Sequence, residues 1–173
     1  MRLQGNHIYL RLLTPEDVGN DYVSWMNDSE ITQYLESRWS AYTLETVRAF
    51  VKAMCDSPKD FLFGMFLNAT NQHIGNIKIG NVNAIHRYGD VGLIIGDKAS
   101  WGKGIASEAI SLVTQYGFEE LNLHKLIAGM YEQNVGSYKA FLKSGYQDAG
   151  RYKAHFFYQG RYVDARFVEK CRE

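Results

Sequence analysis

The sequence predicts an α+β fold, a single domain in which a mixed, mostly antiparallel sheet is flanked by helices. Its 173 residues, 46% hydrophobic and 22% charged, have the size and composition of one soluble domain. The middle of the chain has the apolar alternation of strands, and the chain after Gly104 changes to a helical period. No internal repeat, low-complexity tract or linker divides residues 1–173, so we expect one domain.

The N-terminal part of the chain combines one strand with two helix-start signals. Thr14 as N-cap with Pro15 at the first helical position is a typical helix start, and Thr43 is a second cap. The predicted elements are a strand at His7–Leu12, a helix from Thr14 to about Met26, an irregular segment at Ile31–Tyr42, and a helix from Thr43 to near Ser57-Pro58.

The rest of the chain reads as a meander, two helices and a hairpin. Three strands separated by Gly- and Asn-rich turns favour antiparallel pairing, and apolar residues recur with helical spacing from Ile105 to Tyr116. The predicted strands are Phe61–Leu67, Ile74–Val82 and Tyr88–Ile95, then Leu126–Tyr131, then a hairpin of Arg151–Tyr158 and Tyr162–Glu169 turning at Gln159-Gly160. A short helix from Asn134 to Leu142 should end at Gly145 in a left-handed cap.

Charge is balanced overall but unevenly placed. Nineteen basic and nineteen acidic residues cancel, so no nucleic-acid or membrane partner is expected. Residues 16–60 have a net charge of −5 and residues 98–173 of +3, which suits a cationic ligand at one end and an anionic ligand at the other. The alternative is that these charges lie on solvated helix faces.

Cysteine usage and the N-terminus indicate a cytoplasmic protein. Cys55 and Cys171 have neither metal-binding nor redox spacing, which is typical of free thiols in a reducing compartment. No apolar signal core or membrane-spanning run is present in the sequence, and no two histidines have the spacing of zinc ligands. We therefore expect no metal site.

The most informative segment is the glycine-containing turn from Gly96 to Ala106. It joins an apolar strand to the N-terminus of an amphipathic helix, and Gly102 and Gly104 let the backbone turn tightly. The unpaired N–H groups and dipole of the helix add to an anion site. A Walker A loop is excluded because Gly104, not Ser or Thr, follows Lys103, and a dinucleotide fingerprint is excluded because Ser107 stands where glycine is needed. A purely structural turn is the remaining alternative.

The segment Trp101-Gly102-Lys103-Gly104-Ile105-Ala106-Ser107-Glu108-Ala109 resembles the pyrophosphate-binding motif of the GCN5-related N-acetyltransferases (GNAT superfamily). It is most similar to the branch that contains the RimJ/RimL-like and spermidine acetyltransferases. The resemblance extends over nearly the whole chain, through Ile85-His86-Arg87, Leu121-Asn122-Leu123-His124-Lys125, Asn134, Lys143-Ser144-Gly145-Tyr146 and Gly160-Arg161-Tyr162-Val163-Asp164.

This resemblance implies one acyl-CoA N-acyltransferase domain over residues 1–173, with acetyl-CoA in a V-shaped opening between the fourth and fifth predicted strands. The backbone of Leu93, Ile94 and Ile95 would pair with the pantetheine arm, and Asn134 would contact its far side. The pyrophosphate would be held by Trp101, Gly102, Lys103, Gly104, Ile105, Ala106 and Ser107. In much of the superfamily Gln or Arg stands at the position of Trp101.

Catalysis needs a base for the amine, and a proton donor for the thiolate would help. By resemblance Asp90 is the candidate base, acting through water because its side chain is shorter than the usual Glu; pairing with Arg87 is the structural alternative. His86 is a second candidate base. Phe141 stands where related enzymes usually have the tyrosine acid, so either Tyr138, one turn earlier, replaces it or no acid is needed.

The acceptor is predicted as a primary amine of a small molecule, such as an amino sugar, sugar nucleotide, polyamine or antibiotic. Trp25, Tyr34, Trp39 and Tyr42 interleave with the acids of residues 16–60 and suit such a ligand, although they also suit a core. Two alternatives stay open: a protein N-terminus as acceptor, and a non-catalytic acyl-CoA sensor or adaptor, which Phe141 favours. A homodimer is also left open.

Overall fold

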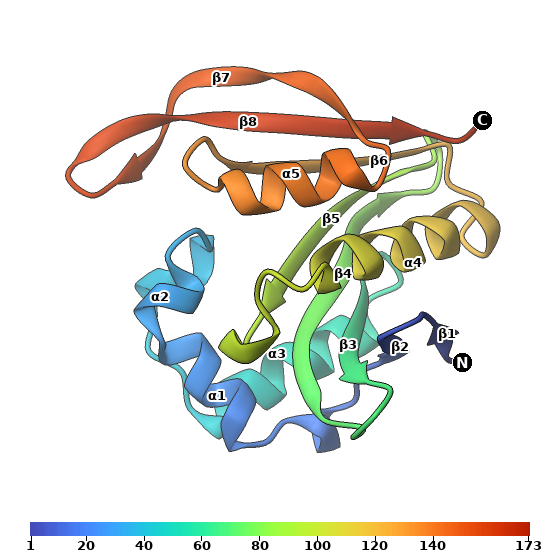
Figure 1. The fold of residues 1–173 in the computed structure, drawn as a ribbon, viewed down its shortest axis with the longest axis vertical. Helices are drawn as coiled ribbons and strands as arrows, with labels where there is room; N and C mark the ends of the chain where they lie inside the picture. The colour runs from blue at the N-terminus through green and yellow to red at the C-terminus, as the bar shows by residue number, and fades with distance from the viewer.

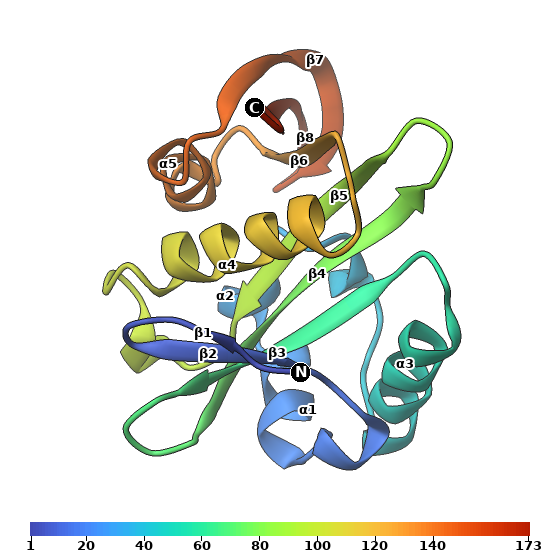
Figure 2. The ribbon, with the colours of Figure 1, turned by 90° about the vertical axis from the view of Figure 1, so that its right-hand side faces the viewer.

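The computed structural model describes residues 1–173 as one eight-stranded sheet with helices on both faces (Figures 1 and 2). The strand order is β1-β2-β3-β4-β5-β6-β8-β7, and every neighbouring pair is antiparallel except β5 and β6. The predicted α+β class and mixed, mostly antiparallel sheet are confirmed. The strands are β1 (Leu3–Gln4), β2 (Ile8–Leu12), β3 (Phe61–Leu67), β4 (His73–Asn83), β5 (Tyr88–Ile95), β6 (Lys125–Tyr131), β7 (Gln147–Tyr158) and β8 (Arg161–Cys171).

Five α-helices and three 3-10 turns flank the sheet. The α-helices are α1 (Asn20–Asn27), α2 (Ser29–Thr32), α3 (Leu44–Asp56), α4 (Ile105–Glu119) and α5 (Val135–Lys143). The 3-10 turns are η1 (Pro15–Asp17), η2 (Glu36–Trp39) and η3 (Lys98–Ser100). Helices α4 and α5 cover one face of the sheet, and α1 and α3 lie on the other (Figure 2). No helix is long and apolar enough to cross a membrane.

The predicted continuous helix from Thr14 to Met26 is wrong, because the chain forms η1 and then α1. The Asp17 carboxylate accepts from the Thr14 N–H at 2.8 Å and pairs with Arg11 at 2.6 Å, which holds the first turn against β2. Val18 then becomes extended and buries its side chain, 1% exposed, before Gly19 caps α1. Burial of Val18 therefore interrupts a helix that the local signals favoured.

Two other predictions need correction in the N-terminal part. The Ile31–Tyr42 segment was expected to be irregular but contains the end of α2 and the whole of η2. The Asp28 carboxylate begins α2 by accepting from the N–H groups of Glu30 and Ile31 at 2.9 and 3.2 Å. The short strand β1 was not predicted. The Thr43 cap is confirmed, since its hydroxyl accepts from the Thr46 N–H at the start of α3.

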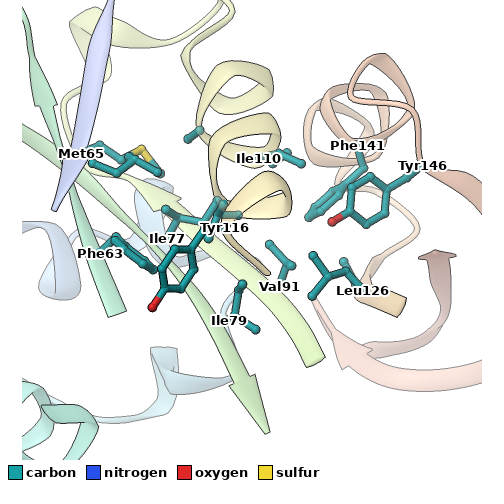
Figure 3. Packing of buried hydrophobic residues seen from close by; sticks show 14 of the residues in the cluster. Phe63, Met65, Ile77, Ile79, Val91, Ile110, Tyr116, Leu126, Phe141 and Tyr146 are labelled. Carbon is teal, nitrogen blue, oxygen red and sulfur yellow. The ribbon is translucent and has the colours of Figure 1, made fainter. Parts of the chain in front are cut away.

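The predicted cap at Gly145 is confirmed and has the hydrogen bonds of a Schellman motif. Gly145 has a φ of 83°, its N–H donates to Leu142 O at 3.0 Å, and the Tyr146 N–H donates to Phe141 O at 3.1 Å. The rings of Phe141 and Tyr146 pack edge to face, 5.0 Å apart (Figure 3). At the hairpin, Gln159 and Gly160 both have a positive φ, as the predicted two-residue turn requires.

Two hydrophobic clusters hold these layers together. The larger packs α4 and α5 onto the sheet, with Ile110 and Tyr116 of α4 against Phe63, Ile77 and other strand residues (Figure 3). The smaller packs α1 and α3 onto the opposite face of β2 and β3. Since α4 is seated by several fully buried side chains, the position of its N-terminus is well fixed.

Candidate active site

A cavity of about 660 Å3 lies where the end of β5 meets the first turn of α4 and one face of α5. Segments far apart in the chain line it, and part of its wall comes from α2 and the residues that follow it. The lining residues are Glu30, Ile31, Gln33, Tyr34, Leu35, Leu93, Ile94, Ile95, Ser100, Trp101, Gly102, Gly104, Ile105, Ala106, Ser107, Asn134, Gly136, Ser137, Lys139, Ala140 and Lys143.

The predicted anion turn lies on the wall of this cavity. Gly102 and Gly104 have φ values of 72° and 81°, and a Cβ built on either would point into open space. The N–H groups of residues 102–107 find no acceptor within the chain, and α4 has no side-chain cap. Six consecutive free donors at a helix N-terminus make a strong site for a phosphate group.

The open edge of β5 forms the second wall. Parallel pairing with β6 ends at Asp90 and Ile127, so the two strands diverge beyond this point as the predicted V-shaped opening requires. The Gly96 N–H donates to Ile74 O, and in an alternating antiparallel ladder this turns the polar groups of Ile94 toward β4. Leu93 and Ile95 therefore present their backbone to the opening, whereas Ile94, predicted with them, does not.

Trp101 and Asn134, both predicted to contact the cofactor, line the cavity, each with a defined structural partner. The Trp101 indole N–H donates to Ile95 O at 2.9 Å, which fixes the turn against β5. The Asn134 side chain accepts from the Ser137 N–H at 3.3 Å and so begins α5 beside the cavity. The side chain of Lys103 is exposed and does not line the cavity, although its N–H belongs to the free donors of the turn.

Asp90 lies outside the cavity lining, on the sheet face opposite α4. Its neighbours Gly89 and Val91 face the α4 core, so alternation directs Asp90 to the other face, together with Lys78. Its carboxylate makes no hydrogen bond or ion pair, including with Arg87. Burial raises the pKa of Asp90, and Lys78 opposes part of that shift. Leu93 is three residues away, about 10 Å along the strand.

The other candidate proton-transfer groups are placed away from the cavity. The Tyr138 hydroxyl donates to Asp148 at 2.9 Å, and its ring lies 4.4 Å from the Arg166 guanidinium carbon, on the side of α5 facing β7 and β8. His86 is exposed in the β4–β5 turn, seven residues from Leu93, or about 23 Å of strand. Phe141 is 1% exposed and packs in the core (Figure 3), so this position offers the cavity no proton donor.

The segment after α2 forms the third wall and is braced by aromatic contacts. Tyr34 stacks on Tyr158 at 5.5 Å and its hydroxyl donates to Gln133 O at 3.3 Å. Tyr158 at the tip of the β7–β8 hairpin donates to Gln33 at 3.2 Å, and Arg38 donates to Phe157 O at 3.1 Å. The hairpin tip thus rests against residues 33–38, which the residue spacing alone did not reveal.

The acids of residues 16–60 are mostly engaged with partners. Asp17 pairs with Arg11 and Asp56 with Lys52, and Asp28 and Glu30 both hold Lys98, at 2.8 and 2.6 Å. Hydrogen bonding to Lys98 lowers the pKa of Asp28. Of the nine acids, Glu30 alone lines the cavity. The acidic stretch therefore does not form an acidic cleft, and Lys98 instead ties α2 to the turn that precedes α4.

Sequence reasoning also missed the α5 wall beyond Asn134. Gly136, Ala140 and Lys143 recur at i, i+4 and i+7 and line the cavity on one helix face, with Ser137 and Lys139 beside them. This spacing of small residues on a helix was a usable signal. The Glu30 and Tyr34 wall had none, because only the fold brings it to β5.

Comparison with known proteins gives the family. Residues 7–147 match the sequence model of the acetyltransferase (GNAT) domain. The uncharacterized N-acetyltransferase YoaA of Bacillus subtilis (strain 168) is 28% identical over 99% of this chain and 98% of its own. The chain belongs to the GNAT acetyltransferase family; it is an N-acetyltransferase, and acetyl-CoA is its acetyl donor.

Two solved structures show the same fold at low sequence identity. The spermidine N-acetyltransferase of Vibrio cholerae, in complex with CoA and spermine, has a TM-score of 0.84 at 23% identity, covering 96% of each chain. RimL, a ribosomal L7/L12 α-N-protein acetyltransferase in complex with CoA, has a TM-score of 0.88 at 14% identity, covering 99% of this chain and 98% of RimL. Both similarities extend over nearly the whole chain, so they confirm the fold.

Proposed function

We propose that this enzyme transfers the acetyl group of acetyl-CoA to the primary amine of a small molecule. The main support for the acetyl-CoA site is the row of free N–H groups from Gly102 to Ser107, which lies beside the open edge of β5. The acceptor side is assigned to the segment around Tyr34, which the β7–β8 tip braces through Tyr158. Amino sugars, sugar nucleotides, polyamines and amine-bearing antibiotics are the candidate acceptors.

The chain's own groups supply most of what the reaction needs. Asp90 accepts the amine proton through water, and burial raises its pKa, which makes the carboxylate a stronger base. The N–H of Leu93 faces the opening and stabilises negative charge on the acetyl oxygen. Tyr138 is our candidate acid only if its bond to Asp148 breaks; otherwise the thiolate, with an ordinary pKa of ~8.5, leaves without one.

A protein N-terminus is the second candidate acceptor. The fold similarity to RimL, described as a protein acetyltransferase, favours it, and the similarity to a spermidine acetyltransferase favours a small amine. The hairpin tip is bonded to Gln33 and Arg38, which holds the segment that carries Tyr34 in place and supports the smaller acceptor.

Thiol release tests both acceptor classes directly. Purified protein is mixed with acetyl-CoA and a panel of amino sugars, sugar nucleotides, polyamines, aminoglycosides and short peptides with free N-termini. We expect amine-dependent release with at least one small amine and none with the peptides. Release with peptides alone would assign the protein N-terminus, and no amine-dependent release across the panel would contradict the proposal.

A further inference from the structure

Two lysines of α5 line the cavity without a partner. Lys139 and Lys143 are one helical turn apart, and neither makes a hydrogen bond or an ion pair. The one acid in the lining, Glu30, is already held by Lys98 at 2.6 Å. The cavity therefore carries two uncompensated positive charges on the α5 wall.

These lysines stand close to the phosphate-binding turn. The Ser144 hydroxyl donates to Ser107 O at 3.0 Å, so the C-terminal end of α5 lies against the first turn of α4. Lys143 directly precedes Ser144. The small residues Gly136 and Ala140 on the same face leave room between α5 and the turn. A ligand held on residues 102–107 thus has Lys139 and Lys143 on its α5 side.

We propose that Lys139 and Lys143 form a second anion subsite, which binds the ribose 3′-phosphate of CoA. This inference rests on the assigned acetyl-CoA donor. Coenzyme A carries a pyrophosphate and, separately, a phosphate monoester; the backbone turn accommodates the first, and two adjacent ammonium groups suit the second. The subsite would make the enzyme distinguish CoA from dephospho-CoA and from a phosphopantetheine arm that lacks the adenosine phosphate.

The competing explanation is that both lysines only solubilise the helix, with Lys143 offsetting the negative end of the α5 dipole. In that case their replacement would change stability a little and would not depend on which ligand is present. A comparison of two ligands that differ only in the 3′-phosphate separates the two explanations.

Isothermal titration with CoA and dephospho-CoA provides this comparison. In the unaltered protein we expect CoA to bind about tenfold more tightly, the effect of roughly one charge-assisted hydrogen bond in a partly exposed site. In the Lys139→Met/Lys143→Met double variant the ratio should fall to near one, through loss of CoA affinity with little change for dephospho-CoA. Raising the salt concentration should shrink the ratio only in the unaltered protein.

A matched control is Lys153→Met, which removes an exposed, unpaired lysine of β7 outside the cavity and should leave the ratio unchanged. Lys139→Arg/Lys143→Arg should retain it. The proposed 3′-phosphate subsite would be contradicted if the unaltered protein bound both ligands equally well, or if the double variant kept the full preference for CoA. Neither result would contradict the rest of the CoA site. Failure to bind either ligand would instead contradict the cofactor site as a whole.

Discussion

The two halves of the cavity, which we propose bind the acetyl donor and the acceptor amine, differ in the groups that form them. The donor half consists of backbone: free N–H groups from Gly102 to Ser107 and the edge of β5 that faces away from β4, where Leu93 is unpaired and Ile95 O accepts from Trp101. The acceptor half consists of side chains, above all Tyr34, with Arg38 and the hairpin tip behind it. Recognition by backbone N–H groups does not depend on the identity of a side chain such as Trp101, whereas recognition by side chains does.

The acceptor half is braced by one largely buried cation, the guanidinium group of Arg38. The Arg38 side chain is 12% exposed and donates to Leu35 O, to the Tyr131 hydroxyl and to Phe157 O, at 2.9, 2.7 and 3.1 Å. It thereby joins η2, β6 and the β7 end of the hairpin. The two halves meet at Lys98, whose ammonium group holds Asp28 and Glu30. Four predictions on three substitutions test this division, from the largest expected effect to the smallest.

Gly104→Val should abolish most of the CoA binding that we assign to the donor half. Gly104 has a φ of 81°, which a β-branched residue rarely adopts, so the turn must change conformation. Losing about three hydrogen bonds to phosphate corresponds to roughly 1,000-fold weaker CoA binding, measured by calorimetry. Gly150→Val imposes similar strain at a φ of 109° on β7, outside the cavity, and should leave CoA affinity unchanged. Unaltered affinity in Gly104→Val would refute the turn as the binding site.

Asp90→Asn should affect turnover and not donor binding. Loss of a general base lowers kcat by about 100-fold, most strongly below the pKa of the amine, while CoA affinity stays within about twofold. The measurement is thiol release against pH with the best amine of the panel. Tyr138→Phe is the parallel variant, expected to change kcat less than about twofold because its hydroxyl is engaged by Asp148. An unchanged pH–rate profile in Asp90→Asn would remove Asp90 from the mechanism.

Lys98→Met should weaken the link between the halves. When the Lys98 ammonium group is removed, Asp28 and Glu30 lose their ion pairs to the turn that precedes α4. The KM for the amine should therefore rise about threefold, which is the effect of losing a partly exposed ion pair. Calorimetry with CoA should show a smaller change. Lys52→Met, which breaks the Lys52–Asp56 pair on α3, should alter neither value. A larger loss of CoA affinity than of amine affinity would place Lys98 in the donor half.

Asp90→Asn should also change the pH dependence of stability. Burial raises the folded-state pKa of Asp90, so the folded state favours the protonated carboxyl group. The contribution of this group to the free energy of unfolding is therefore lost as the pH rises through the folded-state pKa. The neutral Asn variant should therefore melt higher than the unaltered protein at pH 7, and the difference should vanish at acidic pH below the unfolded value of ~3.9. Thermal unfolding followed across pH measures this. A variant less stable at pH 7 would indicate a stabilising contact of the carboxylate.

Much of the backbone geometry in the proposed donor half could be predicted because its features are local. Glycine at positive φ, a helix start without a side-chain cap and the Gly145 helix end each depend on a few consecutive residues. The acceptor half was harder, because Tyr34, Tyr158 and Gln133 meet only through the fold. Tyr138 has a plausible position in the sequence, but tertiary packing directs it to Asp148.

The sequence by itself determined the fold class, the glycine turn and most strand and helix bounds, since hydrophobic period and turn chemistry act over short distances. The family followed from the resemblance of its motifs, above all the segment from Trp101 to Ala109. Tertiary structure decided which backbone groups of β5 face the opening, because the divergence from β6 and the ladder with β4 separate Ile94 from Leu93 and Ile95. It also interrupted the first helix to bury Val18, paired the acids with Lys98, Arg11 and Lys52, and placed Lys139 and Lys143 beside the turn. These outcomes depend on long-range burial and on charges meeting across the fold, which no local pattern encodes.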